Sequence, residues 1–175
     1  MPDMYTITRI LTPVDGSEYS RYAAQHAVRL ARAHGAEVVF LHVVDEQLVD
    51  ELARWDGDET IERTRARLFD NGRVYLEDSA ALAAANDVAH REEIREGDPC
   101  AVITQVAAET RPEVIVVGKI GRRGARRILM GSITRRLIES ADRPVLVVTG
   151  PLEVRASTAA TPLAVASGER QDEKV

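Results

Sequence analysis

The sequence predicts an open, mostly parallel α/β sheet, and three observations carry this prediction. Short apolar runs alternate with segments of helical periodicity over residues 9–148. Residues 38–44 are apolar on both faces, which is typical of a central strand in a parallel sheet. The alternation of strand and helix repeats until five strands are in place. Together these features indicate a parallel sheet whose crossover connections are right-handed.

The expected elements follow one another in a regular order. A glycine at position 35 is expected to end the first helix, and a proline at position 99 lies near the start of the third. The predicted elements are strand 9–14, a helix from 17 or 20 to 34, strand 38–44, a short amphipathic turn around 48–52, helix 59–86, strand 88–95, a helix from 97 to about 110, strand 113–117, helix 132–140 and strand 144–148.

Two of these elements need comment. Asn71 and Gly72 form a weak point in the long helix, where the sequence permits either a kink or a break. The strand over residues 88–95 carries four charged or imidazole side chains in a row, at positions 90–93. Such a strand is too polar for the centre of a sheet. We therefore expect it at an edge, where charge also discourages pairing with other chains.

Composition and charge limit the class of protein. The chain has 175 residues, of which 45% are hydrophobic and 29% charged, a profile typical of one soluble domain. We expect that domain over residues 1–150 and a flexible tail over 151–175, which is rich in Ala, Thr, Ser and charge. The net charge of −5 argues against general affinity for nucleic acid or for a membrane surface.

The same sequence indicates the compartment. The single cysteine, Cys100, excludes an internal disulfide framework and suits a reducing cytosol. The first seven residues show no signal peptide, and no apolar run approaches the roughly 18 residues that a membrane span needs. We expect a cytoplasmic protein that does not insert into membranes.

A glycine motif is the most informative feature of the chain. Gly118 and Gly121 are followed, after nine residues, by Gly131 and Ser132. The motif begins where the apolar run over 114–117 stops and ends at the expected start of a helix. Glycines let the backbone approach a phosphate, and free N–H groups at a helix start bind one. Ser132 is placed either as the N-cap or as a phosphate donor. The sequence therefore predicts a cradle for nucleotide phosphates.

The loop that contains this motif is also basic. It carries seven cationic residues without an intervening Asp or Glu: Lys119, Arg122, Arg123, Arg126, Arg127, Arg135 and Arg136. The last two are expected in the first helical turn, where the helix dipole disfavours cations. A bound polyanion would remove that conflict.

A second loop is expected to meet the glycine motif. Ligands of open α/β sheets bind at the carboxyl ends of the strands, where the strand order reverses. Asp15 follows the first strand and so belongs to that edge. Its carboxylate suits a ribose hydroxyl or a metal ion beside phosphates. The alternative is that Asp15 simply caps the following helix, and local sequence does not separate the two.

Five blocks in order resemble the universal stress protein family over residues 7 to about 149. They are residues 10–18, 41–45 and 95–99, the glycine motif, and residues 144–148. The resemblance implies a five-stranded parallel sheet of order 3-2-1-4-5 with helices on both faces. This is a Rossmann-like architecture shared with adenine nucleotide alpha hydrolases. It also implies homodimers formed partly through the last strand, at about 144–149.

The three motif glycines and the serine resemble the ATP-binding branch of that family. The resemblance implies that ATP, ADP or AMP binds with Mg²⁺, and that Asp15 is a candidate metal ligand. The residues it assigns are Pro13, Val14 and Asp15 on the adenosine side, Val43 against the adenine, and Val117, Gly118, Lys119, Gly121, Arg122, Gly131, Ser132 and Ile133 around the ribose and phosphates. Lys119 and Ile120 replace a small hydroxyl residue and a histidine, so the lysine would strengthen phosphate attraction while Ile120 would lose a contact.

Three other interpretations of the motif are possible. The Walker A pattern and the dinucleotide fingerprint are both absent, and no motif supplies a catalytic base, so we expect a binding module whose turnover of ATP is at most slow. The Gly118–Gly121 segment resembles the nucleic-acid clamp of KH domains, but it follows a β-forming run, and no nucleic acid is expected. A nucleotide-free dimerisation or adaptor module that regulates a partner protein is the remaining alternative.

Two side chains outside the motif are expected to be structural. His42 lies in the second strand and is expected to be a buried imidazole with its hydrogen bond satisfied. Cys100 lies at a helix start, where the thiol pKa can fall, but a packed thiol is the simpler expectation.

Overall fold

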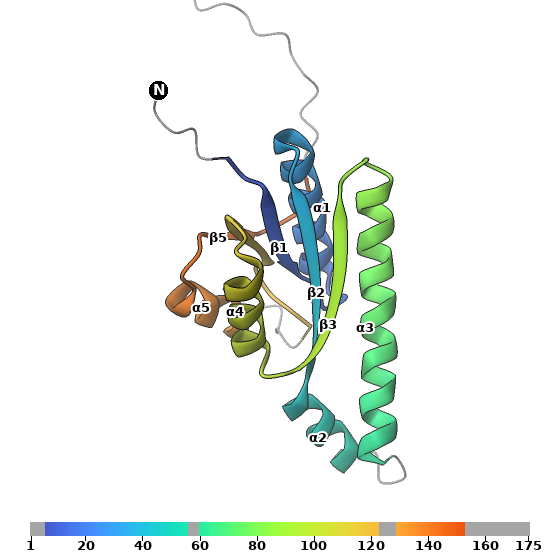
Figure 1. The fold of residues 1–175 in the computed structure, drawn as a ribbon. Coiled ribbons are helices and arrows are strands. Elements are labelled where there is room, and N and C mark those ends of the chain that lie inside the picture. The colour runs from blue at the N-terminus through green and yellow to red at the C-terminus, as the bar shows by residue number, and fades with distance from the viewer. Residues whose placement is uncertain (1–5, 56–59, 123–128, 153–175) are drawn as a thin grey trace, which may run out of the picture.

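A computed structural model describes residues 6–55, 60–122 and 129–152, and it confirms the five-stranded parallel sheet. The strand order is β3-β2-β1-β4-β5, and each pair of neighbours runs parallel (Figure 1). The strands are β1 (Arg9–Pro13), β2 (Glu37–Asp45), β3 (His90–Gly97), β4 (Val114–Gly118) and β5 (Val145–Val148). The helices are α1 (Glu18–His34), α2 (Glu46–Trp55), α3 (Ile61–Ala84), α4 (Pro99–Thr110) and α5 (Ser132–Ser140).

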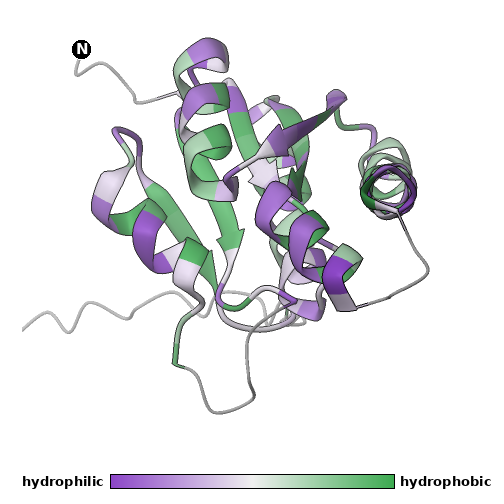
Figure 2. Cartoon of the chain, turned by 90° about the horizontal axis from the view of Figure 1, so that it is seen from below, coloured by the Kyte–Doolittle hydropathy of each residue, from purple (hydrophilic) through white to green (hydrophobic). Residues whose placement is uncertain are grey.

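The helices cover both faces of the sheet, as expected (Figure 1). Side chains of a strand alternate between its two faces, so neighbouring residues of β1 enter different cores. Ile10 packs with Phe40 under α1 and α3. Leu11 packs with Leu41 under α4 and α5. In the view onto the carboxyl ends of the strands, apolar strands lie between helices whose outer surfaces are polar (Figure 2).

The amphipathic turn expected around residues 48–52 is instead a complete helix. α2 begins directly at the end of β2 and continues for ten residues. Val49 is fully buried with Val44 and Leu68, in a cluster that joins α2 to α3 and to the sheet. This tertiary contact stabilises a helix whose local sequence indicated only a turn.

Helix α3 continues without a break through Asn71 and Gly72. Gly72 is buried, and a Cβ at this position would lie 2.9 Å from Nε2 of His42. The glycine therefore makes room for an imidazole from the neighbouring strand. Packing on the sheet compensates for the low helix propensity of this residue.

The charged strand lies at the edge of the sheet, as predicted. β3 pairs with β2 and has no other neighbour among the described strands. Arg95 forms ion pairs with Glu93 at 2.9 Å and with Glu109 at 2.6 Å. The exposed edge is thus covered with paired charges, which discourages strand addition.

No helix in the described parts of the chain is long and apolar enough to cross a membrane. Most of the expected tail lies outside the described residues, which end at Leu152.

Candidate functional site

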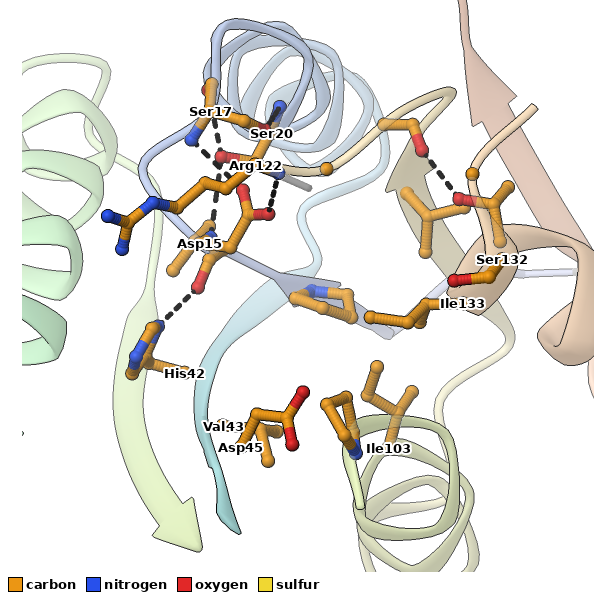
Figure 3. Close-up of a pocket in the computed structure, with 18 of the residues that line it drawn as sticks. Asp15, Ser17, Ser20, His42, Val43, Asp45, Ile103, Arg122, Ser132 and Ile133 are labelled. Atoms are coloured by element: carbon orange, nitrogen blue, oxygen red, sulfur yellow. Dashed lines mark hydrogen bonds between the residues drawn. The ribbon is translucent and has the colours of Figure 1, made fainter. Parts of the chain in front are cut away.

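A cavity of about 330 Å³ opens at the carboxyl edge of the sheet, between the loops that follow β1 and β4 (Figure 3). β1 pairs with both β2 and β4, so the order of strands along the chain reverses at this point. Open α/β sheets bind their ligands at such a point. The ends of β1, β2 and β4 and the starts of α4 and α5 all contribute to the wall.

Eleven of the twelve residues predicted to bind the nucleotide line this one cavity. They are Pro13, Val14, Asp15, Val43, Val117, Gly118, Gly121, Arg122, Gly131, Ser132 and Ile133. The fold therefore brings together residues that are more than 100 positions apart in the sequence.

Lys119 is the predicted residue that does not line the cavity. Its backbone has a structural role, because its N–H donates to the Val148 carbonyl at 2.8 Å and its carbonyl accepts from Gly131 N–H at 2.9 Å. The second of these bonds closes the base of the glycine loop. Ile120 lines the cavity instead, with 8% of its surface exposed. The cavity thus gives no support to the expectation that Lys119 attracts phosphate.

Asp15 ties the two loops together, and the alternative that it is the N-cap of α1 is wrong. The N-cap is Ser17, whose hydroxyl accepts from Ser20 N–H at 3.2 Å. One carboxylate oxygen of Asp15 accepts from Ser17 N–H at 3.0 Å, and the other accepts from Arg122 N–H at 2.9 Å (Figure 3). The carboxylate therefore holds the glycine loop against the β1–α1 loop.

The three motif glycines are required for three different reasons. A Cβ at Gly118 would lie 2.6 Å from the backbone carbonyl carbon of Tyr19, so this glycine allows α1 to approach β4. A Cβ at Gly121 would lie 2.7 Å from the carboxylate of Asp15, so this glycine makes room for the tie between the loops. At Gly131 the nearest atom would be 3.4 Å away, and the chain itself gives no strong reason for a glycine. None of the three has a positive φ.

The start of α5 is the one helix start among α1, α3, α4 and α5 that lacks a side-chain cap. Ser17, Thr60 and Asp98 cap the other three helices through their side chains. Gly131 is the N-cap of α5 and supplies no such bond. The expectation that Ser132 is the N-cap is thus wrong, because Ser132 is the first helical residue. The first N–H groups of a helix have no partner within it, and here they belong to residues that line the cavity.

Thr134 fixes this helix start in place. Its buried hydroxyl donates to the Gly118 carbonyl at 2.9 Å, which joins the first turn of α5 to the end of β4. The arrangement places a positive helix end at the cavity before any ligand arrives. The predicted role of Ser132 as a phosphate donor stays a prediction.

The charge conflict expected in the first turn of α5 is partly resolved by the protein itself. Both terminal nitrogens of Arg136 donate to the carboxylate of Asp98 at 2.9 Å. The pKa of Asp98 is lowered by these bonds and by a further bond from Ala101 N–H. Arg136 therefore has a carboxylate partner within the protein, without a bound polyanion. Arg123, Arg126 and Arg127 lie outside the described residues.

His42 has the structural role that the sequence predicted. Its Nδ1–H donates to the Val14 carbonyl at 2.7 Å, and burial lowers the pKa of the imidazole. The neutral ring thus supports the end of β1 at the wall of the cavity. Cys100 is also buried, and its Sγ lies 3.7 Å from the hydroxyl of Ser140, as expected of a packed thiol.

Several cavity residues were not assigned from the sequence. Asp45 and Leu48 come from the junction of β2 and α2, Asp98 and Ile103 come from α4, and Figure 3 shows Asp45 and Ile103 at the wall opposite Asp15. The block over residues 95–99 was noted in the sequence, yet only the parallel topology places it here. No cluster of three or more metal-ligating side chains occurs within residues 6–55, 60–122 and 129–152.

These observations define an α/β protein with a cavity at the switch point of its sheet, into which a helix start without a side-chain cap opens. The model of the universal stress protein family matches residues 6–149, and the chain belongs to that family.

Individual relatives agree with this assignment. The chain is 34% identical over 143 residues to universal stress protein MJ0531 of Methanocaldococcus jannaschii. The aligned region covers 82% of each of the two chains. It is 29% identical to universal stress protein YxiE of Bacillus subtilis, with 80% of this chain and 97% of the relative covered. The solved structure of universal stress protein UspA from Lactobacillus plantarum superposes with a TM-score of 0.64 at 26% identity, over 83% of this chain and all of that one.

Two more distant relatives have been solved with adenine nucleotides. The Archaeoglobus fulgidus protein was solved with dAMP, and it superposes with a TM-score of 0.61 at 19% identity over 83% of this chain and all of that one. An Arabidopsis thaliana family member was solved with AMP, at a TM-score of 0.56 and 18% identity over 82% and 92% of the two chains. At these identities the likeness concerns the fold.

Proposed function

We propose that the chain binds an adenine nucleotide in this cavity, with the phosphates at the start of α5. The uncapped N-terminus of α5, which opens into the cavity, is the observation that carries the proposal. Anions are stabilised at such an end by the helix dipole and by free N–H groups. The volume of about 330 Å³ falls within the usual range of small-molecule sites. Complexes of distant relatives with AMP and dAMP favour adenine as the base.

The two ends of the cavity suit the two ends of a nucleotide. Apolar side chains, among them Pro13 and Val43, would contact the base. The glycine loop and the start of α5 would take the phosphates of ATP, ADP or AMP. We place Mg²⁺ with the phosphates rather than on Asp15, because both oxygens of that carboxylate already accept backbone N–H groups.

We further propose that the protein is a binding module rather than an enzyme. The carboxylates and the imidazole at the cavity are all engaged in structural contacts. Asp15 accepts two backbone N–H groups, Asp45 accepts from Gln47 N–H, and Asp98 pairs with Arg136. His42 donates its Nδ1–H to the Val14 carbonyl, and its basic Nε2 faces Gly72 of α3, where a Cβ would lie 2.9 Å away. A general base must be free to reach the proton it removes. Any hydrolysis of ATP is therefore expected to be slow.

The proposal includes a homodimer formed through the last strand. β5 is the final strand of the described sheet, and Leu146 on it is 41% exposed. An edge strand with an exposed apolar side chain is suited to pairing with a second copy. In this scheme a bound nucleotide orders the glycine loop and thereby changes a surface that a regulatory partner reads. A nucleotide-free adaptor would use the same edge, and the exposed Leu146 is what favours that second candidate.

The direct test is release of small molecules from freshly purified protein by mild acid, followed by mass spectrometry. Recovery of ATP, ADP or AMP at about one per chain is the expected result. A blank, followed by no thermal stabilisation with millimolar MgATP, would favour the nucleotide-free adaptor.

Gly121→Val tests the position of the site. The new side chain would overlap Asp15 and break its bond to Arg122 N–H, so binding should fall at least about a hundredfold while the fold persists. The control is Gly150→Val, because a Cβ at Gly150 would meet no atom within 4 Å. Circular dichroism checks the fold, and calorimetry measures the affinity. Parent-like binding by Gly121→Val would exclude the cradle.

A further inference from the structure

Tyr75 of α3 contacts three separate parts of the structure that surrounds the cavity, although it belongs to none of the sequence motifs. Its ring lies edge-on to the His42 imidazole, with 5.6 Å between the ring centroids. It also packs on Gly16, where a Cβ would lie 2.6 Å from Cζ of the ring. The guanidinium carbon of Arg122 lies over the ring, 5.6 Å from its centroid. One half-buried side chain thus supports the β1–α1 loop, β2 and the glycine loop.

Arg122 has two parts that behave differently. Its backbone N–H is fixed by Asp15, as described above. Its side chain extends across Asp15 and away from Ser132, toward the side of the cavity on which His42 lies (Figure 3). There the guanidinium rests on Tyr75, in a cation–π contact. The side chain is exposed and forms no ion pair with any described residue.

Among the described residues of the cavity wall, Arg122 is the cation that remains available to a ligand. Among the described residues that line the cavity, Arg122 and Arg136 carry cationic side chains. His42 also lines it, but burial lowers the pKa of its imidazole and the ring is neutral. Arg136 is held by two bonds to Asp98. The start of α5 suits one phosphate group, and a second or third phosphate adds charge that requires a further cation.

We propose that Tyr75 is a positioning residue that sets the preference of the site for the number of phosphates. The ring holds the Arg122 guanidinium away from the start of α5, and a polyphosphate draws the guanidinium off the ring. Binding of ATP then works against the Tyr75–Arg122 contact, whereas binding of AMP leaves it intact. A ligand shifts such an equilibrium only by its difference in affinity for the two positions. The inference rests on the proposed nucleotide function and goes beyond it.

The test compares the affinities of the full chain for AMP and for MgATP in matched variants. A cation–π contact at an exposed site corresponds to about a twofold to fivefold change in an equilibrium constant. Tyr75→Leu should therefore raise the ratio of ATP affinity to AMP affinity by about that factor, while Tyr75→Phe, which keeps a ring, should leave the ratio near that of the parent. In an Arg122→Gln background, Tyr75→Leu should no longer change the ratio. The ratio is informative because general damage to the cavity affects both nucleotides.

A second measurement needs no variant at position 75. The Nε–H signal of Arg122 in NMR should show a ring-current shift in the free protein, keep it with saturating AMP and lose it with saturating ATP. Three results would each overturn this inference but leave the proposed function intact. The ratio of ATP affinity to AMP affinity stays unchanged or falls in Tyr75→Leu, or it still rises when Tyr75→Leu is made in the Arg122→Gln background. The third result is a ring-current shift that ATP does not remove. No binding of any adenine nucleotide by the parent chain would overturn the proposed function and this inference with it.

Discussion

The loops that follow β1 and β4 meet at one cavity, but they differ in whether their hydrogen-bonding groups have partners within the protein. In the β1–α1 loop, Ser17 caps the helix and Asp15 accepts two backbone N–H groups. In the described part of the β4–α5 loop, Gly131 N–H donates to the Lys119 carbonyl, and the start of α5 has no side-chain cap.

The difference separates scaffold from binding surface. A loop whose donors and acceptors are satisfied internally has little to offer an anion, but it can hold a neighbour in position. A loop that leaves helix N–H groups unpaired at a cavity keeps them for a ligand or for water. The first loop therefore fixes the geometry, and the second loop is where we expect the phosphates.

The largest effect is expected from Gly118→Ala, which tests the scaffold. The new methyl group would overlap the backbone of Tyr19, and a backbone cannot move aside as a side chain can. Overpacking of this kind costs about 3 kcal/mol of the free energy of unfolding. Urea denaturation measures the change, and Gly150→Ala, where a Cβ meets open space, is the control. Equal stability of the two variants would show that α1 does not depend on close approach at Gly118.

Gly131→Ala tests the binding surface. Here we expect nucleotide affinity to fall while the free energy of unfolding stays nearly unchanged. The backbone at Gly131 suits alanine, with a φ of −68°, and its Cβ would meet the chain at ordinary distances. Stability should change by less than about 0.5 kcal/mol. The methyl would lie 3.5 Å from the Gly121 nitrogen, between the two loop glycines, so nucleotide affinity should fall about tenfold to a hundredfold. A loss of stability without a loss of affinity would contradict the division between the two loops.

A smaller effect is expected from Gly72→Ala, which acts on the support behind the first loop. A methyl at this position would press on the His42 ring, which donates to the Val14 carbonyl. Overpacking lowers the free energy of unfolding by about 1–3 kcal/mol, and the higher helix propensity of alanine raises it by about 1 kcal/mol. We expect a net loss of up to about 2 kcal/mol in the free energy of unfolding, measured by urea denaturation. A more stable variant would mean that the imidazole shifts freely and supports nothing.

The smallest expected effect concerns the ion pair between Asp98 and Arg136. Asn caps a helix about as well as Asp, so Asp98→Asn removes the charge and keeps the cap of α4. Both side chains are substantially exposed, and we expect a loss of about 0.5 kcal/mol at pH 7.

The pH dependence of this effect has a definite sign. The pKa of Asp98 is lowered in the folded protein, so the pair stabilises it above the pKa of the unfolded chain, about 3.9. The stabilisation is lost as the pH falls through the lower folded value. The difference between parent and variant should therefore be full at pH 7 and shrink on acidification below about pH 4. A difference that grows in acid would assign the effect to something other than this carboxylate.

The sequence determined the sheet and most of the cavity residues on the loops that follow β1 and β4. Apolar runs of strand length, glycines at helix ends and the charged edge strand are local patterns, and each specifies its own element. The glycine motif and Asp15 were recognisable because backbone approach and anion binding require particular residue types at particular spacings. Parallel strands then bring those residues to one edge wherever they lie along the chain.

The tertiary structure decided the role of each residue within the site. That Asp15 ties two loops, that Gly118 faces the backbone of α1 and that Arg136 pairs with Asp98 all depend on contacts between residues remote in sequence. The same holds for the unbroken α3 and for Tyr75 under Arg122. A local pattern records the conformation a residue prefers, whereas the partner of its side chain is fixed only when the helices close on the sheet.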